Sequence, residues 1–313
     1  MKAIVLNEFG GVENLKYTET EKPVIGPDEV LVQVKAISIN PVEAKTRAGK
    51  GIAGRIKDQM PLILGWDISG IITEVGASVT KFKVGDAVFG MVNFPGHGKA
   101  YAEYVAAPQD QLALKPENIS HTDAAAATLA ALTSWQSITQ LGNLKPGSRI
   151  LIHSAAGGVG HYAVQIAKNL GAYVIGTSSA ENKDFVLALG ADEHVDYRSQ
   201  RFEDVVKDID FVYDTIGEDN IDRSLKVIKP GGGIVSLPSG LNVEVAEKAK
   251  ELGINGYRFM VSSNGKDMEE IAAQLEKGQL RSHVSKIFPF DEMAAAHLQI
   301  ESGRTLGKIV VTL

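Results

Sequence analysis

The sequence of 313 residues contains no cysteine. A chain without cysteine cannot form disulfides, use a thiolate nucleophile, or bind zinc or iron–sulfur clusters through sulfur. The seven histidines also lack the i, i+3 or i, i+4 spacing that is typical of metal-ligand pairs. We therefore expect no metal site. The absence of cysteine is compatible with a reducing compartment, and we expect a cytoplasmic protein.

Basic residues and long hydrophobic runs are scarce as well. Lysine and arginine number 32 against 38 aspartates and glutamates, a formal charge of −6. Phosphate-backbone binding needs a concentrated basic surface, so we expect no nucleic-acid partner. The longest apolar run, residues 124–132, is far shorter than the ~18 residues that span a bilayer. The N-terminus reaches Glu8 before a signal-peptide core could form. We expect neither a membrane nor a targeting segment.

The first part of the chain is patterned as strand and turn. In residues 30–39, Val30, Val32 and Val34 alternate with more polar residues, which is the period of a half-buried strand. Similar segments follow, separated by glycine, proline and asparagine. No long helical period interrupts them. We expect an all-β, barrel-like module over about residues 1–110.

From about residue 123 the pattern changes to alternating helices and strands. Strands are predicted at 149–154, 172–177, 209–214, 232–237 and 256–261, with helices after residue 160 and at 181–190, 218–228 and 243–252. This alternation favours a doubly wound parallel sheet. The last 50 residues contain one predicted helix, 267–276, and short strands like those of the first module. We therefore expect the chain to return to that module.

The most specific motif is a glycine-rich turn between a predicted strand and a predicted helix. The pattern G-x-G-x-x-G reads Ala155, Gly157 and Gly160, with alanine in the first place. Glycines let the backbone approach a pyrophosphate, which the free N–H groups of the helix start can bind. In a strand–turn–helix context the motif predicts a dinucleotide site. A turn that is glycine-rich for packing alone is the alternative.

The end of the second predicted strand lacks the acidic residue that is typical of NAD sites. Residues 176–179 read Gly-Thr-Ser-Ser, so no carboxylate is present there to bind the ribose hydroxyls and repel a 2′-phosphate. Hydroxyls can donate to that phosphate, and Lys183 and Tyr197 follow shortly. The sequence thus favours NADP(H). A solvated helix lysine is the alternative for Lys183.

Several further segments give the chain a resemblance to a known family. The core is L-x3-AAGGVG-x4-Q-x2-K, with SINPVEAKTRAG, LGWDISG, VGDAVFG, LTSWQSI, DTIG, RFMVS and GKIVV around it. Together they resemble the zinc-free quinone oxidoreductase branch (zeta-crystallin-like proteins and alkenal/enone reductases) of the medium-chain dehydrogenase/reductase superfamily. The resemblance implies an α/β chain in which a GroES-like β domain is interrupted by a Rossmann domain, with the cofactor in the cleft between them. The implied ranges are 1–123 with 265–313 for the GroES-like catalytic domain, and 124–264 for the Rossmann NADP(H)-binding domain.

The resemblance implies NADPH-dependent, zinc-independent hydride transfer to a quinone or an α,β-unsaturated carbonyl. Alcohol dehydrogenases of the superfamily hold zinc with a cysteine near position 40 and a histidine in a G-H-E segment, whereas this chain has Asn40 and Gly65-Trp66-Asp67. Quinones and enones suit a metal-free site because their developing charge is delocalised. The choice between quinone and enone stays open. So does a second hypothesis, an NADPH-binding sensor, structural or RNA-binding protein without significant turnover.

The resemblance also assigns roles to individual residues. Asn40 would face the nicotinamide and substrate, and Lys45 would lie near them unless it is a solvated loop lysine. The implied cofactor contacts are Thr133 at the domain junction; Gly157, Gly158, Val159 and Gly160 at the pyrophosphate; Ser178, Lys183 and Tyr197 at the 2′-phosphate; Ile216 and Gly217 near the adenosine; Leu237, Met260 and Val261 near the nicotinamide; and Arg304. Trp66 replaces the tyrosine often found at its position, and we expect it in the core. Members are usually homodimers, often paired through the last Rossmann strand, here 256–261.

Overall fold

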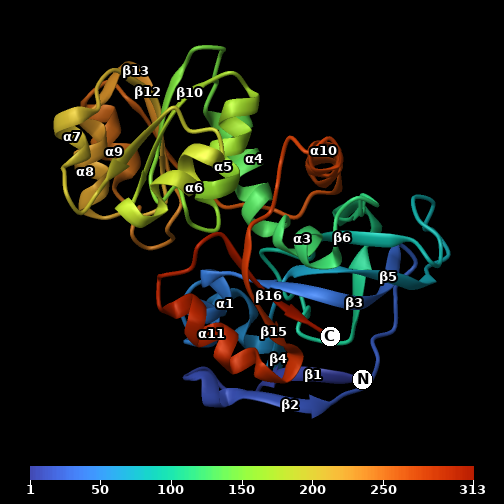
Figure 1. Ribbon diagram of the computed structural model, residues 1–313. Helices are drawn as coiled ribbons and strands as arrows, with labels where there is room; N and C mark the ends of the chain where they lie inside the picture. The colour runs from blue at the N-terminus through green and yellow to red at the C-terminus, as the bar shows by residue number, and fades with distance from the viewer. The chain divides into compact units, whose positions relative to one another are not determined.

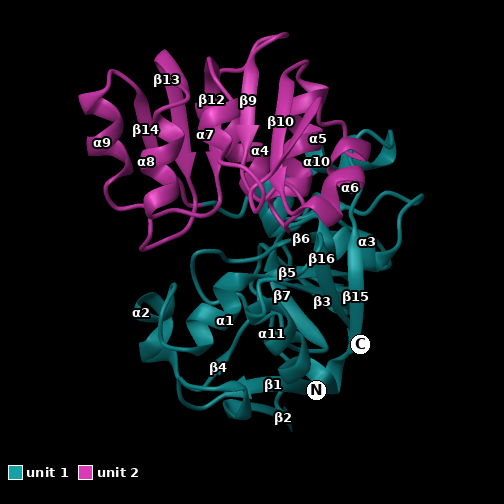
Figure 2. Cartoon of the chain, turned by 60° about the vertical axis from the view of Figure 1, so that its left-hand side comes forward, with its two compact units in different colours: residues 1–132, 261–313 teal, residues 133–260 magenta.

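The computed structural model describes residues 1–313 and divides into two compact units. Unit 1 comprises residues 1–132 and 261–313, and unit 2 comprises residues 133–260 (Figure 2). Unit 1 extends past residue 123 because the segment that follows is hydrogen-bonded to its sheet. Helix α3 (His121–Ala126) crosses that position, and beyond it the backbone N of Leu129 donates to Asp67 Oδ1 at 3.0 Å.

Unit 1 is built mainly on antiparallel strands. Its larger sheet has seven strands in the order β15-β16-β3-β5-β6-β8, with β7 also paired to β3, and a smaller sheet has the order β2-β1-β4. The strand bounds are β1 (Lys2–Leu6), β2 (Leu15–Glu19), β3 (Glu29–Ile39), β4 (Leu62–Ile63), β5 (Asp67–Val75), β6 (Ala87–Met91), β7 (Tyr104–Pro108), β8 (Ala113–Leu114), β15 (Val284–Pro289) and β16 (Lys308–Thr312). The predicted strand at 30–39 is confirmed as β3.

The C-terminal strand completes this sheet from the far end of the chain. β16 pairs antiparallel with β3 and parallel with β15, and Figure 1 shows the red strand among the blue strands of the N-terminal part. Ile309, Val310 and Val311 of β16 are fully buried. The predicted return of the chain to its first module is therefore confirmed.

Two short helices interrupt the strands of the first part, where the sequence pattern predicted none. They are α1 (Pro41–Arg47) and α2 (Ala53–Ile56). At the start of α1 the backbone N of Asn40 donates to the side chain of Glu43 and the backbone N of Glu43 donates to the backbone oxygen of Asn40, with Pro41 in the first turn. Such caps start a helix too short to show a hydrophobic period. The expectation of an all-β module was wrong at this point. The other helices of unit 1 are α3, α10 (Gly265–Glu276) and α11 (Met293–Glu301).

Unit 2 is a six-stranded parallel sheet in the order β11-β10-β9-β12-β13-β14. Numbered within the unit this is 3-2-1-4-5-6, the order of a dinucleotide-binding Rossmann fold. The strand bounds are β9 (Arg149–Ile152), β10 (Tyr173–Ser178), β11 (Glu193–Asp196), β12 (Ile209–Asp214), β13 (Ile228–Ser236) and β14 (Asn255–Arg258). The doubly wound sheet is confirmed, although β11, which reads Glu-His-Val-Asp and buries only Val195, was not predicted.

Helices cover both faces of this sheet. They are α5 (Gly160–Asn169), α6 (Lys183–Ala188), α7 (Phe202–Val205), α8 (Asp219–Leu225) and α9 (Val245–Glu251), preceded by α4 (Leu129–Leu141). In Figure 1, α5 lies to the right of the sheet and α8 and α9 lie to its left. None of the helices in either unit combines the length and apolar character needed to cross a membrane.

Candidate active site

The glycine-rich turn lies where the first strand of unit 2, β9, leads into helix α5. Ser154 adopts a left-handed conformation with φ of +50°. A Cβ atom on Gly160 would clash with Ser154 O and lie 2.9 Å from Ala155 Cα. Glycine at 160 is therefore required for α5 to start this close to the strand end, as the packing alternative proposed.

The same turn also presents free backbone donors. The N–H groups of Gly158 and Val159 have no hydrogen-bond partner within the chain, while the Val159 carbonyl is held by Ser134 Oγ at 3.0 Å. Unpaired N–H groups at the start of a ten-residue helix form an anion site that suits a pyrophosphate. The residues present thus fit a dinucleotide, and packing and binding are compatible uses of the turn.

The residues predicted at the 2′-phosphate lie at the end of β10 and in the segments that follow it. The backbone N of Tyr197 donates to Ser178 O at 3.2 Å. Lys183 is the first residue of α6, and its exposed ammonium has no hydrogen-bond or ion-pair partner. Glu181 is the first acidic residue after residues 176–179, and its carboxylate accepts a hydrogen bond from Ser179 Oγ at 2.9 Å. This cluster offers an uncompensated cation and hydroxyls to a ligand.

His194 belongs to the same cluster and was missed by the sequence analysis. Its Nε2 lies 2.7 Å from Ser178 Oγ. Burial lowers the pKa of His194; the carboxylate of Asp196 opposes this effect and the ammonium of Lys183 adds to it. A lone histidine in a four-residue strand carries no sequence pattern, so only the pairing of β10 with β11 reveals it.

Asp214, which was not among the predicted site residues, positions the next set of predicted contacts. Its buried carboxylate accepts hydrogen bonds from Ile216 N (3.1 Å), Gly217 N (3.0 Å), Asn220 Nδ2 (2.9 Å) and Ser236 Oγ (2.5 Å). Its backbone oxygen accepts from Leu237 N at 3.0 Å. Gly217 has φ of +79°, and a Cβ there would lie 2.7 Å from Leu241 O. Ile216, Gly217 and Leu237 are thus held around one residue.

In unit 1, Asn40 lies at the start of α1, and its backbone N, its side-chain Nδ2 and its side-chain Oδ1 are all hydrogen-bonded within the chain. Its backbone N donates to Glu43 Oε2 at 2.9 Å, and its Nδ2 donates to Glu43 Oε1 at 3.2 Å and to Asp67 Oδ2 at 2.8 Å. Its Oδ1 accepts from Lys308 Nζ, which also donates to Ile39 O at 3.1 Å. A substrate carbonyl can receive an Asn40 hydrogen only if one of these bonds is exchanged.

This network encloses two carboxyl groups and one ammonium, all buried. Burial raises the pKa of Glu43 to about 8, the charge of Asp67 adds to the rise, and Lys308 opposes it. Burial also raises the pKa of Asp67 and lowers that of Lys308. Three ionised groups would leave an uncompensated negative charge in the interior, which is costly. A proton on Glu43 at neutral pH makes the network electrically neutral.

The positions that hold zinc in the alcohol dehydrogenases do not fit a metal here. The Asn40 oxygen is bonded to Lys308. Trp66 is fully buried, donates from Nε1 to Gly96 O at 2.8 Å and packs edge-on against Phe94, so its expected place in the core is confirmed. No group of three or more histidine, aspartate or glutamate side chains in the structure could hold a metal ion.

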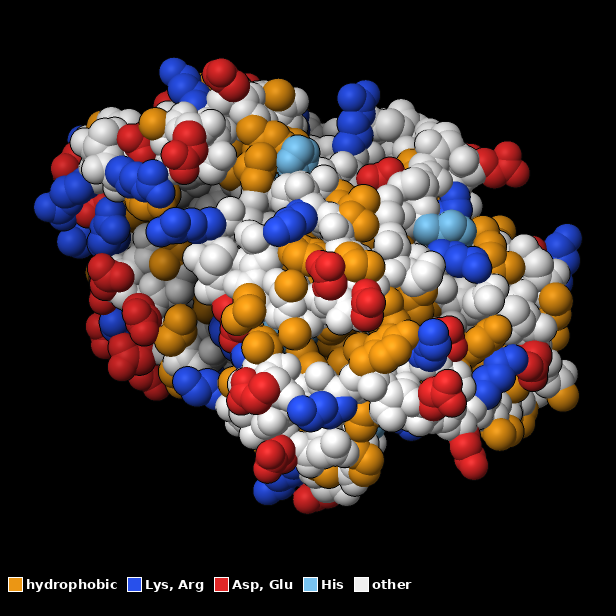
Figure 3. Space-filling model, turned by 60° about the horizontal axis from the view of Figure 1, so that its bottom comes forward, with side chains coloured by type: hydrophobic (Ala, Val, Ile, Leu, Met, Phe, Trp, Pro, Cys, Tyr) orange, Lys and Arg blue, Asp and Glu red, His pale blue; other side chains and the backbone are white.

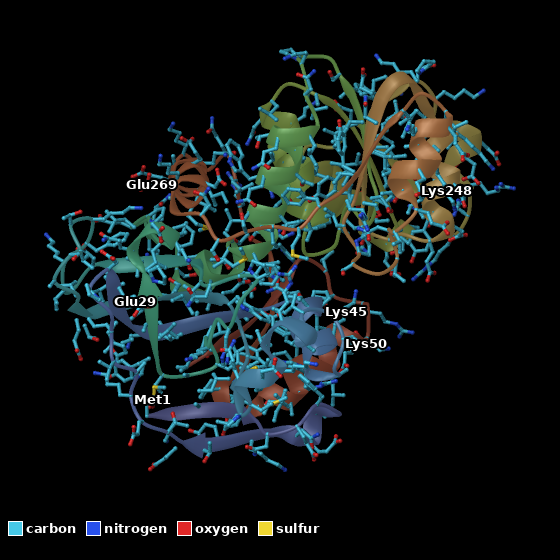
Figure 4. The ribbon with its side chains drawn as sticks, turned by 180° about the vertical axis from the view of Figure 1, so that it is seen from behind. Met1, Glu29, Lys45, Lys50, Lys248 and Glu269 are labelled. Atoms are coloured by element: carbon cyan, nitrogen blue, oxygen red, sulfur yellow. The ribbon has the colours of Figure 1, made fainter.

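The remaining predicted residues are placed as follows. Lys45 is exposed on α1, its ammonium has no partner, and its backbone oxygen accepts from Lys50 N at 2.8 Å; Figure 4 labels both lysines at the surface. Arg304 is exposed in the loop before β16. Thr133 is buried in α4, Val261 is buried, and Met260 is half exposed. Asn40, Lys45, Val261 and Arg304 belong to unit 1, and the other predicted residues belong to unit 2.

Comparisons with known proteins match this architecture. The alcohol dehydrogenase GroES-like domain matches residues 26–117, and the zinc-binding dehydrogenase family matches residues 189–311. The NADPH-dependent alkenal/one oxidoreductase, chloroplastic, of Arabidopsis thaliana is 35% identical over 99% of this chain and 79% of its own length. The solved quinone oxidoreductase of Coxiella burnetii is 36% identical, with a TM-score of 0.95 over 100% of this chain and 99% of that one.

The chain belongs to the quinone oxidoreductase branch of the medium-chain dehydrogenase/reductase superfamily. It is an enzyme, an oxidoreductase with a GroES-like part and a Rossmann part, and its cofactor is a nicotinamide dinucleotide. The quinone oxidoreductase of Escherichia coli, solved in complex with NADPH, has a TM-score of 0.87 at 27% identity over 100% of both chains. Although one matching family is named for zinc, this chain has Asn40 and Trp66 at the positions where the alcohol dehydrogenases of the superfamily have zinc ligands.

Proposed function

We propose that this oxidoreductase uses NADPH, without zinc, to reduce a quinone or an α,β-unsaturated carbonyl. The observation that carries the proposal is the cluster at the end of β10, which offers an unpaired Lys183 ammonium and hydroxyls and has no carboxylate at residues 176–179. Relatives named for alkenal/one, 2-haloacrylate and quinone substrates support the substrate class.

The chain's own residues would then divide the work. When bound, the nicotinamide supplies the hydride. The free N–H groups of Gly158 and Val159 would hold the pyrophosphate, with Ser178, Lys183 and Tyr197 at the 2′-phosphate. Ile216, Gly217, Leu237, Met260, Val261, Thr133 and Arg304 are the other proposed cofactor contacts.

At the substrate, Lys45 is the group best able to donate to a carbonyl oxygen, because its ammonium has no partner. Asn40 would orient the carbonyl only by exchanging a hydrogen bond, and it otherwise fixes the start of α1, the helix that carries Lys45. Hydride transfer leaves an enolate or a hydroquinone monoanion, which then takes up a proton from solvent.

The test is a stopped-flow assay of NADPH oxidation with an ortho-quinone, a para-quinone, an enone and an alkenal. We expect turnover of at least one of these classes of compound, and the relative kcat/KM values will show which class is the preferred substrate. Tight NADPH binding with no turnover of any compound would overturn the proposed reaction.

A binding protein without turnover is not favoured, because the relatives are named as oxidoreductases. For the RNA-binding version in particular, the face in Figure 3 carries basic side chains interspersed with acidic ones over much of its area.

We also propose a homodimer formed through β14, which is the last strand of its sheet and has no partner strand on its outer edge. A monomer in sedimentation equilibrium at micromolar concentration would contradict it. A cytoplasmic location stays a prediction.

A further inference from the structure

The hydroxyl of Ser178 has one hydrogen and two candidate acceptors. Its Oγ lies 3.2 Å from Ser179 O and 2.7 Å from His194 Nε2, and the side chain is almost fully buried. If Nε2 carries no hydrogen, the serine donates to it and has no hydrogen left for a ligand. If Nε2 carries a hydrogen, the imidazole donates to Oγ, and the serine hydrogen is free to turn elsewhere. The tautomer and the protonation state of His194 together decide what Ser178 can offer, and the imidazolium, which carries a hydrogen on both ring nitrogens, always donates from Nε2.

Burial is the largest influence on the imidazole in the free protein and favours its neutral form. Burial lowers the pKa of His194, and so does the ammonium of Lys183 on α6. Asp196, on the same strand as His194, acts in the opposite direction but already accepts from Arg198 N at 3.1 Å. Two other charged groups of this region neutralise each other, because Arg198 Nη1 and Glu181 Oε1 form an ion pair at 3.6 Å. Strand β10 contributes the Ser178 hydroxyl to this side.

A phosphate dianion at this cluster would change that balance. It would be attracted to Lys183 and would favour a positive charge on the neighbouring imidazole. A ligand that carries only ribose hydroxyls would not supply this charge. The two ligands therefore differ in the protonation state that they favour.

We propose that His194 is a specificity-determining residue that takes up a proton when a dinucleotide with a 2′-phosphate binds, so that the imidazolium shares the phosphate charge with Lys183 and releases the Ser178 hydroxyl to donate. The proton comes from solvent, and no covalent bond changes. The inference rests on the proposed use of NADP(H), and it adds that the preference for NADPH over NADH is linked to pH.

The decisive measurement is calorimetric titration of the full-length protein with NADPH and with NADH at pH 7.5. Titrations in buffers of different ionisation enthalpy give the number of protons taken up. At this pH the 2′-phosphate is mostly dianionic, so its own titration contributes little. We expect net proton uptake with NADPH and none with NADH. The ratio of NADPH to NADH affinity should fall as the pH rises from 6.5 to 8.5.

The variant His194→Gln isolates the imidazole, because glutamine can still bond Ser178 but cannot hold the charge. We expect it to abolish the NADPH-linked uptake, to weaken NADPH binding at pH 6.5 by roughly tenfold, and to leave NADH binding unchanged. His283→Gln, at a partly exposed histidine of unit 1, is the matched control. An unchanged NADH affinity and an unchanged melting temperature would show that His194→Gln keeps the wild-type fold.

The outcomes separate this inference from the function on which it rests. A wild-type protein that prefers NADPH but takes up no proton, or a His194→Gln variant with the same uptake as wild type, overturns the role of His194 alone. A wild-type protein that binds NADPH and NADH equally overturns the proposed NADP(H) preference itself. Because the wild-type uptake is measured directly, a variant that fails to fold does not prevent the decision.

Discussion

At the scale of single residues, the decisive positions are polar groups held in apolar surroundings. Lys308 lies in the apolar run GKIVV and Asp67 in LGWDISG, and both are fully buried beside Asn40. A charged residue within an apolar run is a usable sequence signal, because it must find a partner when buried. The identity of the partner is not readable, since Asp67 and Lys308 are separated by most of the chain.

Replacing Lys183 by alanine tests the 2′-phosphate cluster. We expect Lys183→Ala to weaken NADPH binding by about 10- to 100-fold, because a charge-assisted hydrogen bond contributes roughly 1.5–3 kcal/mol. NADH binding should change little. Fluorescence titration with both cofactors measures this. Lys207→Ala, at another exposed lysine of unit 2, is the control, and equal losses for both cofactors would place Lys183 elsewhere.

The buried Glu43 makes stability depend on pH. Its pKa is about 8 when folded against an ordinary value of 4.5, so between these values the folded state binds more protons than the unfolded state. The free energy of unfolding therefore falls as the pH rises through this window. We expect the free energy of unfolding of Glu43→Gln to decrease less over this pH window than that of the wild type, by an amount on the order of a few kcal/mol.

Urea unfolding of both proteins at pH 5, 6.5, 8 and 9 measures this difference. The exposed Glu21→Gln is the control and should follow the wild-type profile. Parallel pH profiles for Glu43→Gln and the wild type would mean that Glu43 is ionised in the folded state.

At the scale of elements, the strand–turn–helix of the cofactor site was predictable and the helices of the first module were not. The glycine motif between β9 and α5 is local, so its spacing reports its geometry directly. α1 is a seven-residue helix whose cap depends on Glu43, and such a helix is too short for periodicity to reveal.

A methyl group at Gly160 tests the turn. We expect Gly160→Ala to lower the free energy of unfolding by about 1–3 kcal/mol, because the new Cβ clashes with Ser154 O, and to abolish dinucleotide binding. Gly54→Ala in α2 meets open space and should stabilise by up to about 1 kcal/mol. Thermal unfolding with and without NADPH measures both. A Gly160→Ala protein that melts and binds like the wild type would show that the turn tolerates a side chain.

At the scale of the whole molecule, the two units are built differently along the chain. All six strands of unit 2 come from one continuous segment, whereas the larger sheet of unit 1 needs β16 from the C-terminus. The expected domain ranges, 1–123 with 265–313 and 124–264, remain predictions, and the compact units change at residues 132/133 and 260/261.

Truncation tests this difference. Ending the chain after Gly303 removes β16, with three buried apolar residues and Lys308. We expect limited proteolysis of this variant to degrade unit 1 and to leave a resistant fragment near residues 133–260. Removal of Leu313 alone, which is 39% exposed, should leave the wild-type pattern. A truncated chain as resistant as the full-length protein would contradict the role of β16.

The sequence alone determined the features that depend on local spacing: the glycine turn, the alternation of helices and strands in unit 2, the missing carboxylate at residues 176–179 and the motifs of the family. Local spacing is enough there because neighbouring residues in the chain form each feature. Which distant groups meet depends on the tertiary fold. It joined Lys308 to Asn40 and Asp67, and His194 to Ser178, because strand pairing brings together residues that share no sequence pattern.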